Sequence, residues 1–118
     1  DHILTLAART LASMHLRPDN IERNLMLLRG LNMAENVMVE LARRGMGRQQ
    51  AHEIMRQSSM IAFEERKELK DVLLENEAVT GCLKPEEISS LLDPHQYIGT
   101  AVQQVERLND KLRKLYLA

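Results

Sequence analysis

Cysteine, long apolar runs and an excess of charge of one sign are absent or scarce in this 118-residue sequence. Cys82 is the single cysteine, so no disulfide can form within the chain, and we expect a reducing compartment, the cytoplasm. No apolar run reaches the roughly 18 residues that span a bilayer, so we predict no membrane partner. The formal net charge is −1, which gives no reason to expect a nucleic-acid partner.

The first residues also lack two features. Residues 1–5 contain neither an initiator methionine nor the basic and then apolar layout of a signal peptide. We therefore expect the sequence to be part of a longer protein.

Aromatic residues are scarce as well, at 3% of the chain, and tryptophan is missing. Hydrophobic residues nevertheless make up 44%, supplied by Leu, Met, Ile, Val and Ala, a selection that suits helices better than strands. No segment alternates between apolar and polar residues with a period of two, so we predict an all-α fold without a sheet. We expect five of the seven methionines to fill the core: Met26, Met33, Met38, Met55 and Met60.

Residues 29–52 predict a helix, a corner marked by glycines and the start of a second helix. Apolar residues recur there at helical spacing: Ala34, Val37, Met38, Leu41 and Ala42. Gly30 and Gly45 lie where a helix end favours a positive φ, and Gly47 precedes the next helix. The sequence therefore predicts a helical hairpin in this segment.

Further helices are predicted on both sides of the hairpin, giving a compact domain of about six to eight helices. The expected ranges are 3–15, 18–29, 48–65, a shorter helix ending near residue 75, one that begins at Pro85, and 101–115. Ile21, Leu25 and Leu28 form the predicted buried stripe of the second helix. Residues 76–84 are expected to be a loop.

Three short segments carry a family resemblance. They are GLNMAE at residues 30–35, GMGRQQAHE at residues 45–53, and LLDPHQYIG at residues 91–99, which Ala101, Val102 and Val105 follow. In this order the segments resemble the carboxy-terminal domain of adenylosuccinate lyases, which belong to the fumarase/aspartase superfamily. The resemblance runs from about residue 17 to residue 108, so residues 1–16 are expected to end a central-bundle helix and residues 17–118 to form the C-terminal-like domain.

The resemblance implies a lyase that splits adenylosuccinate to AMP and fumarate in purine biosynthesis, as a homotetramer without cofactor or metal. It also implies that this chain holds no catalytic residue. The family's catalytic serine lies in a loop of the form Ser-Ser-x-Met-Pro-x-Lys-x-Asn, and its phosphate ligands resemble an Arg-x-x-x-x-Ser pattern expected just upstream. We therefore expect the 118 residues alone to be inactive.

Four groups of residues are candidates for chemistry, and each has a simpler structural interpretation. Ser58-Ser59-Met60 imitates the catalytic loop but lies in a predicted amphipathic helix, so we interpret it as a packing pair. His2, His15, His52 and His95 have no spacing of metal ligands, so we predict no zinc site.

Basic residues and a turn make up the other two groups. Arg43, Arg44, Arg48 and Arg56 could bind a phosphate, but Glu40 and Glu53 lie near them in sequence, so we interpret them as a solvated face. Residues 93–97 are interpreted as a turn, with Asp93 as its cap and the Tyr97 hydroxyl seeking a partner.

Two alternatives remain open at this stage. A 3-carboxy-cis,cis-muconate cycloisomerase of the same superfamily has a similar end domain. A stand-alone helical interaction module could instead pair the apolar stripe from Ala101 to Leu115 with a partner helix.

Overall fold

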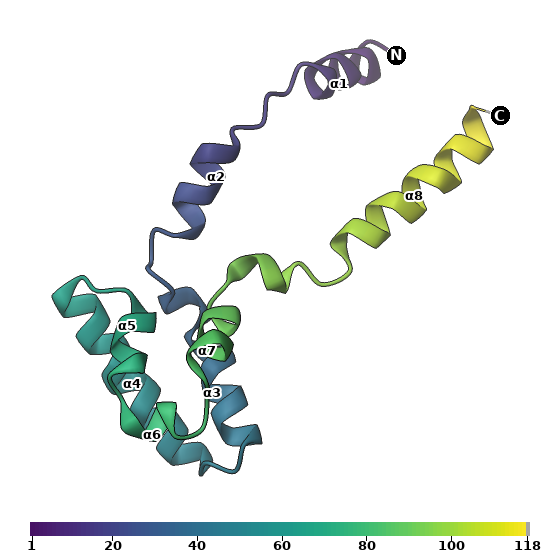
Figure 1. Cartoon of the computed structure of the whole chain (residues 1–118). Coiled ribbons are helices and arrows are strands. Elements are labelled where there is room, and N and C mark those ends of the chain that lie inside the picture. Colours follow the sequence, from purple (N-terminus) through teal and green to yellow (C-terminus); the bar gives the residue numbers. More distant parts are fainter. Residues whose placement is uncertain (118) are drawn as a thin grey trace.

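In the computed structural model, which describes residues 1–117, every regular element is a helix. This confirms the all-α prediction (Figure 1). The α-helices are α1 (His2–Ala12), α2 (Pro18–Leu25), α3 (Ala34–Arg43), α4 (Arg48–Glu65), α5 (Leu69–Leu74), α6 (Glu77–Thr80), α7 (Pro85–Leu91) and α8 (Ala101–Tyr116). Two 3-10 helices, η1 (Leu31–Met33) and η2 (Pro94–Tyr97), complete the set. No helix in this part of the chain is both long and apolar enough to cross a membrane.

The core lies between α3, α4, α5, α6 and α7. The α3–α4 hairpin is the largest packing unit, α5 packs on α4, and α7 closes on both α3 and α5 (Figure 1). The buried side chains that form one cluster are Val37, Leu41, Ala51, Met55, Ala62, Leu69, Val72, Leu73, Val79, Leu83 and Ile88. In α3, α4 and α5 they recur at helical spacing, so these helices turn their apolar faces into one shared interior, to which α6 adds Val79 and α7 adds Ile88.

The predicted corner of the hairpin is confirmed. Gly45 follows α3 with φ +97°, the left-handed conformation that glycine adopts without steric cost. The Met46 N–H donates to the Leu41 carbonyl at 3.1 Å and the Gly45 N–H to the Ala42 carbonyl at 3.2 Å. This pair of bonds is a Schellman motif, which satisfies the last carbonyls of α3 and reverses the chain into α4.

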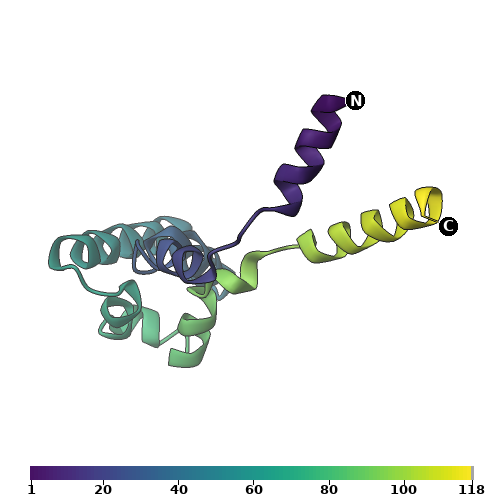
Figure 2. The same cartoon turned by 90° about the horizontal axis from the view of Figure 1, so that it is seen from above.

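Two arms extend from this core: one consists of α1 and α2, and the other of α8. Figures 1 and 2 show α1 and α8 as the parts farthest from it, both on the same side, and the molecule measures 61 × 29 × 23 Å. Neither α1, α2 nor α8 contains a buried residue. The compactness predicted for the whole chain is therefore found in the segment from η1 to α7.

The buried stripe predicted for α2 is wrong for this structure. Ile21 is 50% exposed and Leu28 51% exposed, while Leu25 is half-buried. The helical spacing was interpreted correctly, but α2 leaves the core, so no other described helix covers its apolar face. Periodicity indicates which face of a helix is apolar and not what packs on it.

The loop predicted at residues 76–84 is also wrong in part, because it contains α6. The Asn76 side chain accepts a hydrogen bond from the Ala78 N–H at 3.0 Å and so caps the start of this helix. Val79 is fully buried in the core. One cap and one buried side chain are enough to hold a single turn that is too short to show a period.

Candidate functional site

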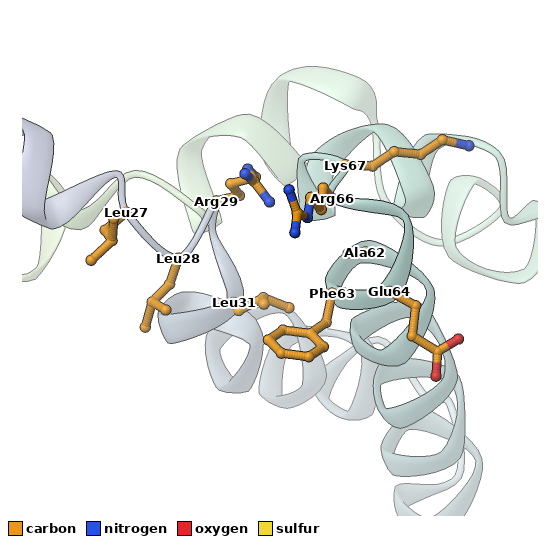
Figure 3. Close-up of a pocket in the computed structure, with 9 residues that line it drawn as sticks. All are labelled: Leu27, Leu28, Arg29, Leu31, Ala62, Phe63, Glu64, Arg66 and Lys67. Atoms are coloured by element: carbon orange, nitrogen blue, oxygen red, sulfur yellow. The ribbon is translucent and has the colours of Figure 1, made fainter.

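A groove lies where the segment after α2 meets the C-terminal end of α4 (Figure 3). Its volume is about 430 Å³. The residues that line it are Leu27, Leu28, Arg29, Leu31, Ala62, Phe63, Glu64, Arg66 and Lys67. These residues come from two segments that are distant in sequence, so only the fold brings them together.

A backbone hydrogen bond joins the two sides of this groove. The Leu69 N–H, just beyond α4, donates to the Arg29 carbonyl at 3.0 Å. Gly30, with φ +85°, follows Arg29 and turns the chain into η1; a Cβ at Gly30 would lie 3.6 Å from the Leu69 Cβ. This hydrogen bond therefore fixes the segment after α2 against the segment after α4 at one end of the groove.

Two arginines supply the free positive charge in the groove. Lys67 forms an ion pair with Glu65 at 2.7 Å, which raises the pKa of the lysine, whereas neither Arg29 nor Arg66 has an ion-pair partner among residues 1–117. Figure 3 shows the nitrogen ends of Arg29 and Arg66 pointing toward one another, while Lys67 and Glu64 extend away from them. The two guanidinium groups thus face one another, and no carboxylate of residues 1–117 lies within 4.0 Å of either, although Glu64 also lines the groove.

Arg29 and Arg66 share a backbone peculiarity. They have φ values of +49° and +56°, and no other non-glycine residue in the described range has a positive φ. Arg66 ends α4 much as Gly45 ends α3: the Lys67 N–H donates to the Ala62 carbonyl at 3.0 Å, the counterpart of the bond from Met46 to Leu41, and the Arg66 N–H donates to the same Ala62 carbonyl. An arginine therefore occupies a position that usually favours glycine.

Apart from Glu64 and Lys67, the rest of the groove is apolar. The Phe63 ring is 71% exposed and Leu28 lies on the opposite segment (Figure 3). The lining contains no serine, cysteine or histidine. Such an arrangement can bind an anionic group beside an apolar one, and it offers no serine or cysteine nucleophile with a histidine base.

The serine pair is a packing feature, as predicted. Ser58 is 2% exposed and faces the core, and Ser59 is half-buried. Met60 is 48% exposed and Met26 44%, so the prediction that these two methionines fill the core is wrong. Met33 and Met55 are buried and Met38 is half-buried, as predicted for core residues. Met26 lies beyond the end of α2 and Met60 on the outer face of α4, where no described helix covers them.

The structure does not bring the four histidines together, and no three His, Cys, Asp or Glu side chains of residues 1–117 form a cluster that could hold a metal. His95 has its Nε2 3.1 Å from the Glu22 carboxylate, so it links η2 to α2. His52 lies exposed on α4.

Three of the four candidate arginines are paired with glutamates. Arg44 donates to Glu40 at 3.0 Å, to Glu87 at 2.6 Å and to the Cys82 carbonyl at 3.2 Å, which joins α3 to the start of α7. Arg43 lies 3.5 Å from Glu40. The prediction of a solvated, neutralised face is confirmed for these residues.

The third pair is Arg56 and Glu53. Arg56 holds both Glu53 oxygens, at 2.9 and 2.7 Å. These bonds, followed by one from Gln57, lower the pKa of Glu53 to about 2. Arg56 is therefore engaged on its own helix, on the exposed surface of α4.

Sequence comparison assigns the family. The model of the adenylosuccinate lyase C-terminus matches residues 30–108, two thirds of the chain. The chain belongs to this family. Adenylosuccinate lyase of Methanocaldococcus jannaschii is 51% identical over 96% of the chain, and that of Archaeoglobus fulgidus is 47% identical over 92%.

A relative with another printed activity is also similar. The 3-carboxy-cis,cis-muconate cycloisomerase of Pseudomonas aeruginosa is 40% identical over 88% of the chain. The chain spans 24% of each of the two lyases and 22% of the cycloisomerase. It thus corresponds to about a quarter of the length of these relatives.

Within the family match, residues 93–97 form the predicted turn. The Asp93 carboxylate accepts from Gln96 at 3.1 Å and from the His95 N–H at 3.0 Å, and both bonds lower the pKa of Asp93. The Tyr97 hydroxyl donates to the Leu91 carbonyl at 3.2 Å, while the residue stays 46% exposed. The motif therefore shapes the exit from α7 toward α8.

The groove between Arg29 and Arg66 was not predicted from the sequence of this adenylosuccinate lyase C-terminal family member. A weak signal was present, because Arg29 precedes Gly30 at a helix end and Arg66 follows the last apolar turn of α4. The residues that flank each arginine in the sequence do not predict that it adopts a left-handed conformation or that it faces the other arginine.

Proposed function

We propose that this chain is the C-terminal helical domain of an adenylosuccinate lyase. Such a lyase splits adenylosuccinate into AMP and fumarate, and acts likewise on the succinyl-carboxamide intermediate of purine synthesis. The observation that carries the proposal is the 51% identity to the Methanocaldococcus jannaschii lyase over 96% of the chain. The whole enzyme is expected to be a cytoplasmic homotetramer that acts on a small-molecule substrate without cofactor or metal.

Within that enzyme we assign residues 1–16 to the end of a central-bundle helix and residues 17–118 to the C-terminal domain. Arg17, which precedes Pro18, has the non-helical backbone angles φ −115° and ψ 85°, and this supports a boundary there because the helix cannot continue through it. The exposed apolar faces of the arms are consistent with burial against the remainder of a larger protein.

We further propose that this chain contributes no catalytic residue. Ser58 is buried in the core and the groove lining contains no serine, cysteine or histidine, which supports this assignment. The test is to incubate the purified 118-residue chain with adenylosuccinate and measure fumarate release. We expect none, and measurable release would contradict the proposal.

The second candidate is the cycloisomerase, favoured by the 40% identity to the Pseudomonas aeruginosa enzyme. The protein that contains this chain should be assayed on adenylosuccinate and on 3-carboxy-cis,cis-muconate. We expect turnover of the first substrate alone. Turnover of the second alone would replace our proposal with the cycloisomerase.

The third candidate is a stand-alone interaction module that uses α8. Val105, Leu108, Leu112 and Leu115 are exposed along one helix. An open reading frame that starts with methionine close to Asp1 would favour this candidate. Several hundred preceding codons, which we expect, would exclude it.

A further inference from the structure

We propose that Arg29 and Arg66 form a binding site for a small organic anion that carries a carboxylate or a phosphate beside an apolar body. The site is the groove of Figure 3, between the segment after α2 and the end of α4. The proposal does not depend on lyase activity, because it concerns binding by residues of this chain alone.

The backbone conformation is the first argument. A left-handed conformation costs a residue with a Cβ roughly 1–2 kcal/mol, a cost that glycine does not have. Both arginines adopt this conformation. At the same position of the same motif, α3 uses Gly45. Strain of this kind persists at functional sites, where the side chain is needed in a particular place.

Charge is the second argument. Two guanidinium groups point toward one another (Figure 3), and neither is paired with a carboxylate of residues 1–117. An anion bound between them would relieve the repulsion between the two positive charges. Compensation of the α4 dipole does not explain the pair, because a single cation there is sufficient and Lys67 already lies at that helix end.

The chemical class of the ligand follows from the lining. Arginine presents parallel N–H donors that match carboxylate and phosphate oxygens, which makes a planar or tetrahedral oxyanion the preferred group. Phe63 and Leu28 provide exposed apolar surface beside the two arginines. A groove of about 430 Å³ is within the size range of small-molecule sites.

Isothermal titration of the 118-residue chain with four probes tests the proposal. Phosphate and phenyl phosphate form one pair, acetate and benzoate the other, so that only the second member of each pair carries a phenyl group. We expect binding of at least one oxyanion type, tighter for the phenyl member of the pair. The comparison of the pairs identifies which oxyanion the arginines prefer.

Variants locate the site. Arg66→Gly keeps the turn, since glycine accepts the left-handed φ, and is expected to weaken probe binding by at least about tenfold, as is Arg29→Gly. Phe63→Ala should abolish the advantage of the phenyl probes. Arg113→Ala on α8 removes an exposed arginine elsewhere and should leave binding within about twofold.

Circular dichroism of each variant shows whether the helices are intact. If no probe binds to the folded chain, the proposal is overturned. It is also overturned if Arg66→Gly binds the probes as tightly as the unchanged chain, or if Arg113→Ala weakens binding as much as Arg66→Gly.

Discussion

Residues 45 and 66 occupy the same position in two helix-ending turns, one as glycine and the other as arginine. Glycine reaches a positive φ freely, whereas arginine reaches it against a steric cost. The two residues therefore show separately what the turn requires of the backbone and where a side chain is kept in spite of that requirement. At residue 45 the turn needs only the backbone, and at residue 66 a side chain is retained despite the cost.

This contrast predicts opposite changes in stability. Gly45→Ala is expected to lower the free energy of unfolding by about 1 kcal/mol, since nothing lies within 4 Å of the added Cβ and the loss is conformational. Arg66→Gly is expected to raise it by roughly 0.5 kcal/mol, because the relieved strain exceeds the added chain entropy. Urea unfolding measures both, and changes of equal sign would contradict the prediction.

Glu53 predicts a pH dependence. Its pKa of about 2 in the folded chain lies below its ordinary value of 4.5, so the ionised carboxylate favours the folded state. The stabilisation is present above pH 4.5 and is lost as the pH falls toward 2. Thermal unfolding of the unchanged chain should therefore lose more stability over this window than that of Glu53→Gln.

Glu106→Gln is the control for this measurement, because Glu106 forms no ion pair within residues 1–117. Its pH profile should follow that of the unchanged chain. If the stability of Glu53→Gln changes with pH as that of the unchanged chain does, the contact between Glu53 and Arg56 does not stabilise the folded state.

At the scale of elements, the α3–α4 hairpin organises the core. Leu41 is fully buried between helices, whereas Val39, two residues earlier on the same helix, is 47% exposed. The glycine corner and the apolar period could both be predicted because each depends on local sequence. The single turn of α6 could not be predicted, because its stability depends on burial of Val79 against other helices.

These two residues predict a difference in stability. Leu41→Ala should cost about 2–5 kcal/mol by leaving a cavity in the core. Val39→Ala should cost less than about 0.5 kcal/mol, because its side chain contributes little to packing. Denaturant unfolding measures the free energy of unfolding of both variants. Similar losses would show that Leu41 does not belong to the core.

At the scale of the whole molecule, a packed core carries two arms that bury nothing of their own. Exposed apolar residues on α8, such as Leu108 and Leu112, give this arm a surface typical of a buried helix. In the proposed lyase the remaining parts of the enzyme would cover it. The core is therefore stabilised by its own packing, whereas the arms depend for their stability on other parts of a larger protein.

Truncation tests this division. A chain that ends at Gly99 lacks α8 and should retain the unfolding free energy of the core within about 0.5 kcal/mol. A chain that ends at Lys84 also lacks α7 and the fully buried Ile88, and should lose about 2–5 kcal/mol or fail to fold. Thermal unfolding by circular dichroism measures both, and loss of cooperative unfolding in the longer chain would contradict the division.

The amino-acid sequence by itself determined the helical class, the hairpin at Gly45, the turn at Asp93 and the family resemblance, because each depends on local spacing or on a contiguous motif. Only the tertiary structure decided that α2 is uncovered and that Arg29 faces Arg66 across a groove. The physical reason is that periodicity indicates an apolar face without its partner. Likewise, the left-handed conformation of an arginine is imposed by the contacts around it and not by its own side chain.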